Sequence, residues 1–104
     1  MNRLVLLSAL TVSLLSINPV QAAVIFAGKE KAMAVCSHCH GIIKPSVDAP
    51  FPSLAGRDLT YLKTALGQYR DKTRKNDIMN ALAGSLTDND ISNISAYYSS
   101  LKTK

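Results

Sequence analysis

The segment Cys36-Ser37-His38-Cys39-His40 constrains the fold of this 104-residue chain more than any other feature. It has the C-x-x-C-H spacing of covalent haem attachment. Two thiols three residues apart on a helical turn can each add to one vinyl group of haem. The following histidine then points its imidazole at the iron. The motif therefore predicts one haem c, bound through Cys36 and Cys39, with His40 as the proximal iron ligand.

Three other interpretations of the two cysteines are weaker. A zinc ion could use Cys36, Cys39 and one histidine, but a structural zinc site needs four ligands and usually a second pair elsewhere, and the chain has no cysteine or histidine outside residues 36–40. A thioredoxin-like redox pair belongs in a βαβ setting, and no stretch alternates like a strand. A disulfide would close a very short loop, constrain little of the unfolded chain, and leave His40 unexplained.

The first 22 residues have the pattern of a secretory signal peptide. Arg3 gives a positive start, residues 4–17 are almost unbroken apolar sequence, and small side chains precede a cleavage site after Ala22. A retained membrane anchor is the alternative, although a spanning helix needs about 20 apolar residues. We therefore expect a signal peptide over residues 1–22, one domain over residues 23–104, and a periplasmic location.

The size and charge of the remaining chain narrow its function further. A domain of 82 residues has a thin core and often needs a cofactor or metal for stability. Without Arg3 it has 11 basic and 7 acidic residues, a net charge of +4, which favours acidic partners. No dense Lys/Arg stripe with interleaved aromatic residues is present, and nucleic acid is not an expected partner.

The domain is predicted to be all-α, with helices joined by loops. Three prolines between Ile42 and Pro52 rule out a regular helix there. Asp58 is a predicted helix cap, and Thr87 with Asp90 forms a predicted capping box. The expected helices are Ala27–Val35, Leu59–Asp71, Asp77–Ala83 (closed by Gly84) and one following Thr87.

Apolar residues at helical spacing predict the buried face of each helix. The expected core residues are Ala32, Met33 and Val35 in the first helix, Leu59, Leu62, Leu66 and Tyr69 in the second, and Ile91, Ile94, Tyr97, Tyr98 and Leu101 in the last. The apolar residues of the proline-containing loop are also expected to pack on the domain.

Met79 is the candidate for the sixth iron ligand. His38 lies inside the attachment loop, Met33 precedes it on the proximal side, and Met1 leaves with the signal peptide. A lone methionine at helical spacing can instead be a core residue. An iron with His and Met at its two axial sites has no open position for a substrate, which points to electron transfer rather than catalysis.

Two further residues are candidates for contacts around the haem. A metal-bound histidine usually donates its second ring N–H to a carbonyl or carboxylate, and the rigid Pro52 is placed to accept it. Pro52 can equally be an ordinary loop proline. Arg74 belongs to a basic cluster with Arg70, Lys72 and Lys75, which is either a solvated turn or a site for a haem propionate or an acidic partner.

Several motifs in order resemble a class I c-type cytochrome. They are Cys36 to Gly41 (CSHCHG), Phe51 to Gly56 (FPSLAG), Arg74 to Met79 (RKNDIM), Leu86 to Ile91 (LTDNDI) and Ala96 to Tyr98 (AYY). The resemblance covers residues 23–104 and is greatest to short bacterial single-haem proteins and to one half of the two-haem c4 kind. Two departures are the loop 42–49, which lacks a Gly-rich stretch, and Arg57, where the c4 kind commonly has Gln.

The resemblance implies three to five helices wrapped round one haem, with the first and last helices crossing at Gly28 and Tyr97. It also implies axial ligation by His40 and Met79, and Pro52 as the carbonyl partner of His40. The expected function is one-electron transport in a respiratory chain, without catalysis. The alternatives are a haem subunit bound to a dehydrogenase and a peroxidase with an open iron site. The expected partners are oxidases, reductases or dehydrogenases with acidic docking surfaces, with at most peripheral membrane contact.

Overall fold

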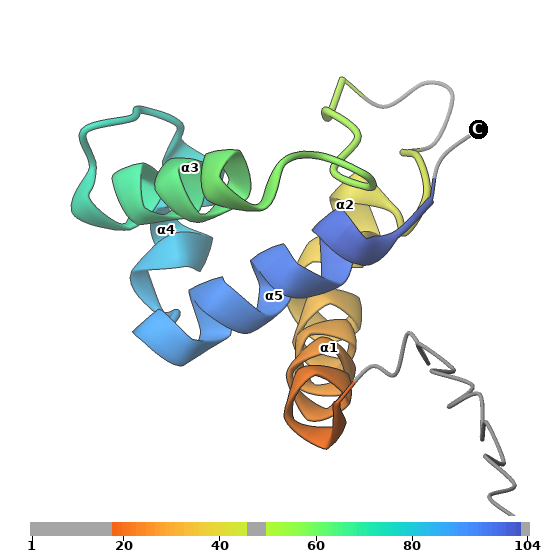
Figure 1. The fold of residues 1–104 in the computed structure, drawn as a ribbon. Coiled ribbons are helices and arrows are strands. Elements are labelled where there is room, and N and C mark those ends of the chain that lie inside the picture. The colour runs from red at the N-terminus through yellow and green to blue at the C-terminus, as the bar shows by residue number, and fades with distance from the viewer. Residues whose placement is uncertain (1–17, 46–49, 103–104) are drawn as a thin grey trace, which may run out of the picture.

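The computed structural model describes residues 18–45 and 50–102, and these form helices joined by loops, without a strand (Figure 1). The elements are α1 (Pro19–Lys31), the π-helical segment η1 (Ala32–Cys36), α2 (Ser37–His40), α3 (Leu59–Asp71), α4 (Asp77–Gly84) and α5 (Asp88–Ser100). The predicted all-α class is confirmed. No helix among the described residues is long and apolar enough to span a membrane. Most of the predicted signal peptide, residues 1–17, lies outside the described residues, so the two predicted domain boundaries stay predictions.

The first helix is longer than the predicted span Ala27–Val35 at both ends. It begins at Pro19, where the Asn18 side chain accepts a hydrogen bond from the Gln21 backbone N–H at 2.7 Å. Proline is favoured at the first helical position because a backbone N–H has no partner within the helix there, so proline loses no hydrogen bond. At the other end, the helix continues through the wider turn of η1 into α2. The attachment motif is therefore helical from its first cysteine to His40.

Side-chain caps mark the starts of the other three long helices, and two of these caps were predicted. Asp58 accepts from the Tyr61 backbone N–H at 2.9 Å, which places the start of α3 as predicted. Thr87 and Asp90 each accept the other's backbone N–H at 3.0 Å, which confirms the capping box of α5. Asn76, which was not predicted as a cap, accepts from the Met79 backbone N–H at 2.9 Å and starts α4.

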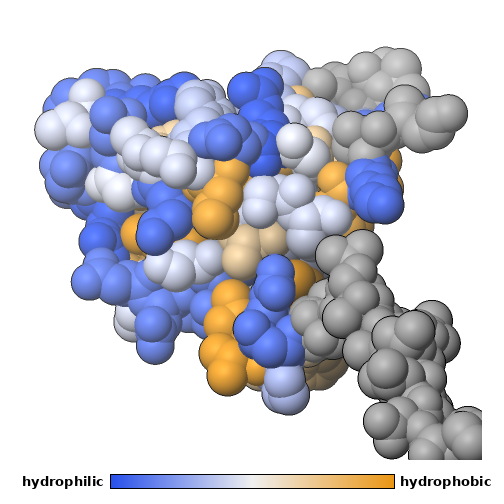
Figure 2. All heavy atoms as spheres, viewed as in Figure 1, coloured by the Kyte–Doolittle hydropathy of each residue, from blue (hydrophilic) through white to orange (hydrophobic). Residues whose placement is uncertain are grey.

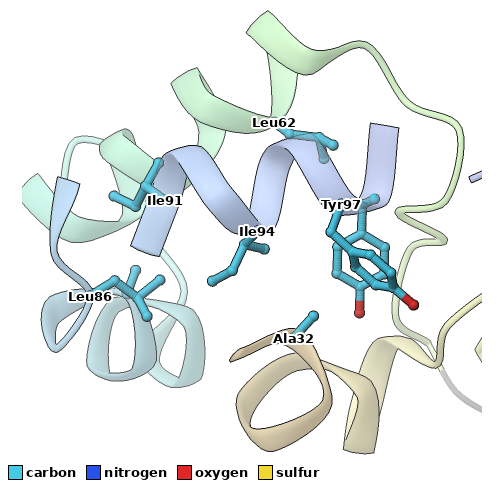
Figure 3. Packing of buried hydrophobic residues seen from close by; sticks show 8 residues of the cluster. Ala32, Leu62, Leu86, Ile91, Ile94 and Tyr97 are labelled. Carbon is cyan, nitrogen blue, oxygen red and sulfur yellow. The ribbon is translucent and has the colours of Figure 1, made fainter. Parts of the chain in front are cut away.

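The crossing of α1 and α5 organises the fold. In Figure 1 the two helices cross near the middle of the molecule, with α3 and α4 on one side of α5. Gly28 is buried at the crossing, close to Asn93 and Tyr97 of α5, as the resemblance implied. Figure 3 shows Ile94 and Tyr97 projecting from α5 toward Ala32.

The predicted core is mostly correct, and the exceptions have physical reasons. Tyr98, Ile94 and Ile91 are buried on α5, and Leu101 is partly buried. Met33 is 47% exposed and Leu59 is 42% exposed, so both predictions were wrong. The wider π-helical turn of η1 rotates Met33 away from the direction that a regular helix would give it. Leu59 is the first residue of α3.

Part of the proline-containing loop packs as expected. Ile42 is partly buried against the core, but Ile43 is 47% exposed, which contradicts the expectation that all apolar residues of this loop are covered. The Ser53 hydroxyl donates to the Ile43 carbonyl at 2.9 Å and thereby joins the two ends of the loop. Residues 46–49 lie outside the described part of the chain.

Candidate haem site

A cavity of about 380 Å³ opens between α2, the segment 50–54, α3, α4 and α5. Its wall is mainly aliphatic and aromatic, and its volume lies in the range of small-molecule and cofactor sites. The structure brings all six predicted site residues to this one wall: Cys36, Cys39, His40, Pro52, Arg74 and Met79. Residues that are up to 43 positions apart in the sequence therefore face a common space.

Both cysteines of the attachment motif line the cavity. Cys36 is the last residue of η1 and Cys39 lies in α2, and both are free thiols. Burial raises the pKa of the Cys36 thiol to about 11, with a smaller opposing effect of the Lys31 charge. The Cys36 thiol is therefore protonated at neutral pH when it carries no covalent group.

His40 is oriented by a hydrogen bond to the following loop. Its imidazole is 9% exposed, and its Nδ1 lies 2.7 Å from the Pro52 carbonyl oxygen. Because a carbonyl oxygen only accepts, Nδ1 carries the hydrogen and the neutral ring has its lone pair on Nε2. The Phe51 ring lies at 6.0 Å from the imidazole and tilts against it. This arrangement leaves Nε2 free to bind a metal.

Met79 reaches the same cavity from α4, and a network of two asparagines holds its turn. Asn76 caps the Met79 N–H, and the Asn76 N–H donates to the Asn80 side-chain oxygen at 2.9 Å. The Asn80 amide donates to the carbonyls of Tyr69 and Arg74, both at 2.8 Å. The start of α4 is thus tied to the end of α3. This network was not predicted from the sequence, although an asparagine just before a predicted helix is a cap signal.

Arg74 lies at the edge of the cavity between two aromatic rings. Its guanidinium lies 5.8 Å from the Tyr61 ring centroid and 5.2 Å from the Tyr69 centroid, and it donates to the Tyr61 hydroxyl at 3.3 Å. Arg57 lies over the Tyr61 ring, at 5.3 Å. The hydrogen bond from Arg74, followed by its charge, lowers the pKa of Tyr61. Two cations therefore flank an exposed tyrosine at this edge.

The other three residues of the basic cluster, Arg70, Lys72 and Lys75, do not line the cavity. Arg70 donates to the Leu86 carbonyl and forms an ion pair with Asp88 at 2.7 Å, so it joins α3 to α5. Lys72 and Lys75 are exposed and do not line the cavity. The solvated interpretation of the cluster fits these lysines, whereas Arg74 alone faces the cavity.

The residues of the cavity fit a haem. Its wall is largely apolar, as a flat macrocycle requires, and it includes two thiols and one imidazole from within five consecutive residues. The Ser95 hydroxyl on this wall is fully buried and has no hydrogen-bond partner among the described residues. Ser95 was not predicted, and nothing in its local sequence marks it. The zinc interpretation gains no support, because no three His, Cys, Asp or Glu residues of the described chain are grouped to hold a metal.

Comparison with known proteins agrees with this geometry. The chain matches the family described as Cytochrome c over residues 25–102. The chain belongs to the cytochrome c family. The family confirms the predicted haem c, which Cys36 and Cys39 are spaced to bind covalently, and it confirms that the protein is an electron carrier.

Several bacterial cytochromes are similar to this chain. Cytochrome c-554(548) of Halomonas halodenitrificans is 39% identical over 77 residues, which cover 71% of this chain and 92% of the relative. Cytochrome c4 of Pseudomonas aeruginosa is 40% identical over 76 residues, 73% of this chain and 37% of c4. The thiosulfate dehydrogenase electron acceptor of Stutzerimonas stutzeri is 33% identical over 78 residues, 72% of this chain and 36% of the relative. The chain thus spans nearly the whole of one relative and little more than a third of the other two.

Proposed function

We propose that this cytochrome c is an exported carrier of single electrons whose iron is bound by His40 and Met79. The observation that carries the proposal is the 2.7 Å contact between His40 Nδ1 and the Pro52 carbonyl, which leaves Nε2 as a ligand. Met79 lines the same cavity and supplies a thioether, the ligand that with histidine raises the reduction potential. With both axial positions filled, the site favours electron transfer over substrate chemistry.

A haem held by Cys36, Cys39, His40 and Met79 would supply the redox chemistry, a one-electron change between ferric and ferrous iron. The protein residues set the conditions of that cycle. The Pro52 carbonyl polarises the His40 ring and raises its basicity, and the aliphatic wall limits water and lowers the local dielectric. The asparagine network of α4 fixes the Met79 backbone, so little rearrangement accompanies the change of charge.

Arg74 is proposed to pair with a haem propionate. Its guanidinium lines the cavity and is held between Tyr61 and Tyr69, which limits the rotamers it can adopt. Guanidinium groups bind carboxylates through paired charge-assisted hydrogen bonds. Among the described residues, Arg74 is in neither of the ion pairs, so its charge remains available.

The proposed partners are redox proteins with acidic docking surfaces. Figure 2 shows hydrophilic side chains over the end of the molecule formed by α3 and α4. Arg57 and Arg74 both lie against the ring of Tyr61, a residue of α3 that lines the cavity. Positive groups at this position would steer an acidic partner. The proposed location is the periplasm, on the basis of the leader pattern in residues 1–22.

A haem subunit bound to a dehydrogenase is the second candidate. The relative from Stutzerimonas stutzeri, named for accepting electrons from thiosulfate dehydrogenase, favours it. Native size separates the two candidates. A lone domain in extracts supports the shuttle, whereas co-elution with a large chain supports the subunit.

A redox titration of the haem-loaded protein, combined with carbon monoxide addition, tests the proposal. We expect a single one-electron transition, and we expect the reduced protein to bind carbon monoxide slowly or not at all. Rapid binding would show an open iron site and would contradict axial ligation by Met79.

A further inference from the structure

Tyr98 makes hydrogen bonds to the two segments that carry His40 and Pro52. Its hydroxyl donates to the Gly41 carbonyl at 2.9 Å, across 57 positions of sequence. Gly41 directly follows His40, so the tether acts one residue from the imidazole. The Tyr98 side chain is fully buried on α5 and belongs to the hydrophobic core cluster.

The backbone of Tyr98 holds the second segment. Its carbonyl accepts from the Gly56 N–H at 2.8 Å, and Gly56 closes the turn after Pro52. Gly56 has a φ of 76°, a conformation that favours glycine, so the turn is built to bring this N–H to α5. Tyr98 is thus hydrogen-bonded both to the segment that contains His40 and to the segment that contains Pro52.

These contacts form a closed ring. It runs from the Tyr98 hydroxyl to Gly41, through His40 to the Pro52 carbonyl, and along the chain to Gly56 and the Tyr98 carbonyl. The His40–Pro52 hydrogen bond is the link in this ring that joins the end of α2 directly to the loop that contains Pro52. Its length therefore depends on both anchors that Tyr98 provides.

The burial of Tyr98 makes its hydroxyl a reliable donor. Desolvation raises the pKa of the phenol above its ordinary value, so the hydroxyl is protonated and able to donate at neutral pH. The ring also packs on Tyr97, with 5.3 Å between centroids, which limits its motion. A buried donor of this kind is costly to release without a replacement partner.

We propose that Tyr98 is a positioning residue for the iron ligand: its hydroxyl and carbonyl hold the His40 and Pro52 segments in register and so tune the haem potential. The proposal rests on the proposed axial role of His40. A strong bond to Pro52 makes the imidazole more basic and stabilises the ferric state. Loosening the Tyr98 tether should weaken that bond and raise the potential.

The test compares Tyr98→Phe with Tyr97→Phe in the haem-loaded, reduced protein. Tyr97 is the matched control because it is adjacent, 5% exposed, and its hydroxyl has no partner among the described residues. The first measurement is the exchange rate of the His40 Nδ1 hydrogen, by nitrogen-labelled histidine NMR. The chain has two histidines, so exposed His38 provides an internal reference. The second measurement is the midpoint potential.

We expect Tyr98→Phe to speed exchange about tenfold, the effect of one lost hydrogen bond, and to raise the potential. Tyr97→Phe should leave both unchanged. Exchange and potential as in the wild type in Tyr98→Phe would overturn the proposal, even if that variant unfolds more easily. Absence of a His40 iron-ligand signal from the wild type would instead contradict the proposed axial ligation.

If Tyr98→Phe does not fold, two replacements of similar size keep the test decisive. A 4-aminophenylalanine at position 98 retains a donor, whereas 4-methylphenylalanine fills the same space without one. Slow exchange in the first and fast exchange in the second would support the positioning role. Equal exchange in both would refute it.

Discussion

Gly28 of α1 lies so close to α5 that a Cβ added there would come 2.9 Å from the Tyr97 Cβ and would overlap the Asn93 carbonyl. The two helices therefore meet backbone to backbone at this point. The approach brings the residues of α5 close to the helix that leads into the attachment motif. The haem cavity depends on this crossing, because α5 forms one of its walls.

Gly28→Ala should lower the free energy of unfolding by about 1–3 kcal/mol, because the helices must separate to admit the methyl group. Gly67→Ala is the control. Gly67 lies in α3, where an added Cβ meets nothing within 4 Å, so alanine should stabilise by about 0.5–1 kcal/mol. Urea denaturation of both haem-loaded variants provides the comparison. Equal stability of the two variants would show that the crossing is looser than described.

Removing both attachment cysteines should unfold the chain. The buried hydrophobic core is small, and the haem would occupy a cavity of about 380 Å³ that core residues such as Leu62, Ile94 and Tyr98 line. We expect Cys36→Ala with Cys39→Ala to lose most of its helix, because binding energy and folding energy are coupled in small cofactor domains. Far-UV circular dichroism measures the loss, and the wild-type chain produced without haem is the control. Native helix content in either haem-free protein would refute the coupling.

Asp90→Ala should cost about 1 kcal/mol at neutral pH, the usual value of a helix cap. The Thr87 backbone N–H donates to the carboxylate and lowers its pKa, so this stabilisation is present above the unfolded value near 3.9. This stabilisation should be lost as the pH falls through the lower pKa that Asp90 has in the folded protein. The free energies of unfolding of the wild type and the variant should then converge. Asn89→Ala, at an exposed neighbouring site, is the control. If the free energies of unfolding of the wild type and Asp90→Ala differed by the same amount at pH 7 and pH 2, the ionised carboxylate would not be the source of the stabilisation.

Arg74→Gln should lower the midpoint potential. A positive charge at the cavity edge disfavours the ferric state, which has one more positive charge than the ferrous state, so its removal favours oxidation. Lys75→Gln removes the same charge from an exposed position outside the cavity and should shift the potential less, because solvent screens it. Redox titration of both variants at low and high salt gives the comparison. Equal shifts would indicate a general charge effect without a propionate contact.

The helix caps and the attachment motif could be predicted because both depend on residues close in sequence. Asp58 and the Thr87–Asp90 pair each satisfy backbone N–H groups within three positions, and the structure reproduces them. The His40–Pro52 contact was predicted from the chemistry of metal-bound histidine rather than from any local pattern.

The features that were missed depend on distant contacts. The Asn80 amide bonds and the Tyr98 tether to Gly41 join residues up to 57 positions apart, and no spacing rule reports them. The exposure of Met33 was missed because the wider turn of η1 breaks the helical period used to predict its face. The early start of α1 at Pro19 was missed because small residues there also fit a cleavage site.

Met79→Ala should leave the fold mostly intact and open the iron. We expect rapid carbon monoxide binding by the reduced protein and a midpoint potential lower by about 0.1 V, a modest part of the roughly 0.8 V range that axial ligands set. Met33→Ala is the control, because Met33 is exposed on the first helix and lies outside the cavity wall. An unchanged potential in Met79→Ala would show that another group binds the iron.

The optical spectrum of the purified wild-type protein, oxidised and then reduced, tests the account most directly. Axial ligation by His40 and Met79 predicts sharp low-spin c-type bands on reduction. In the oxidised form it predicts the weak far-red band of sulfur bound to ferric haem, and this band should disappear in Met79→Ala. A high-spin spectrum, or a low-spin spectrum without the sulfur band, would contradict axial ligation by His40 and Met79.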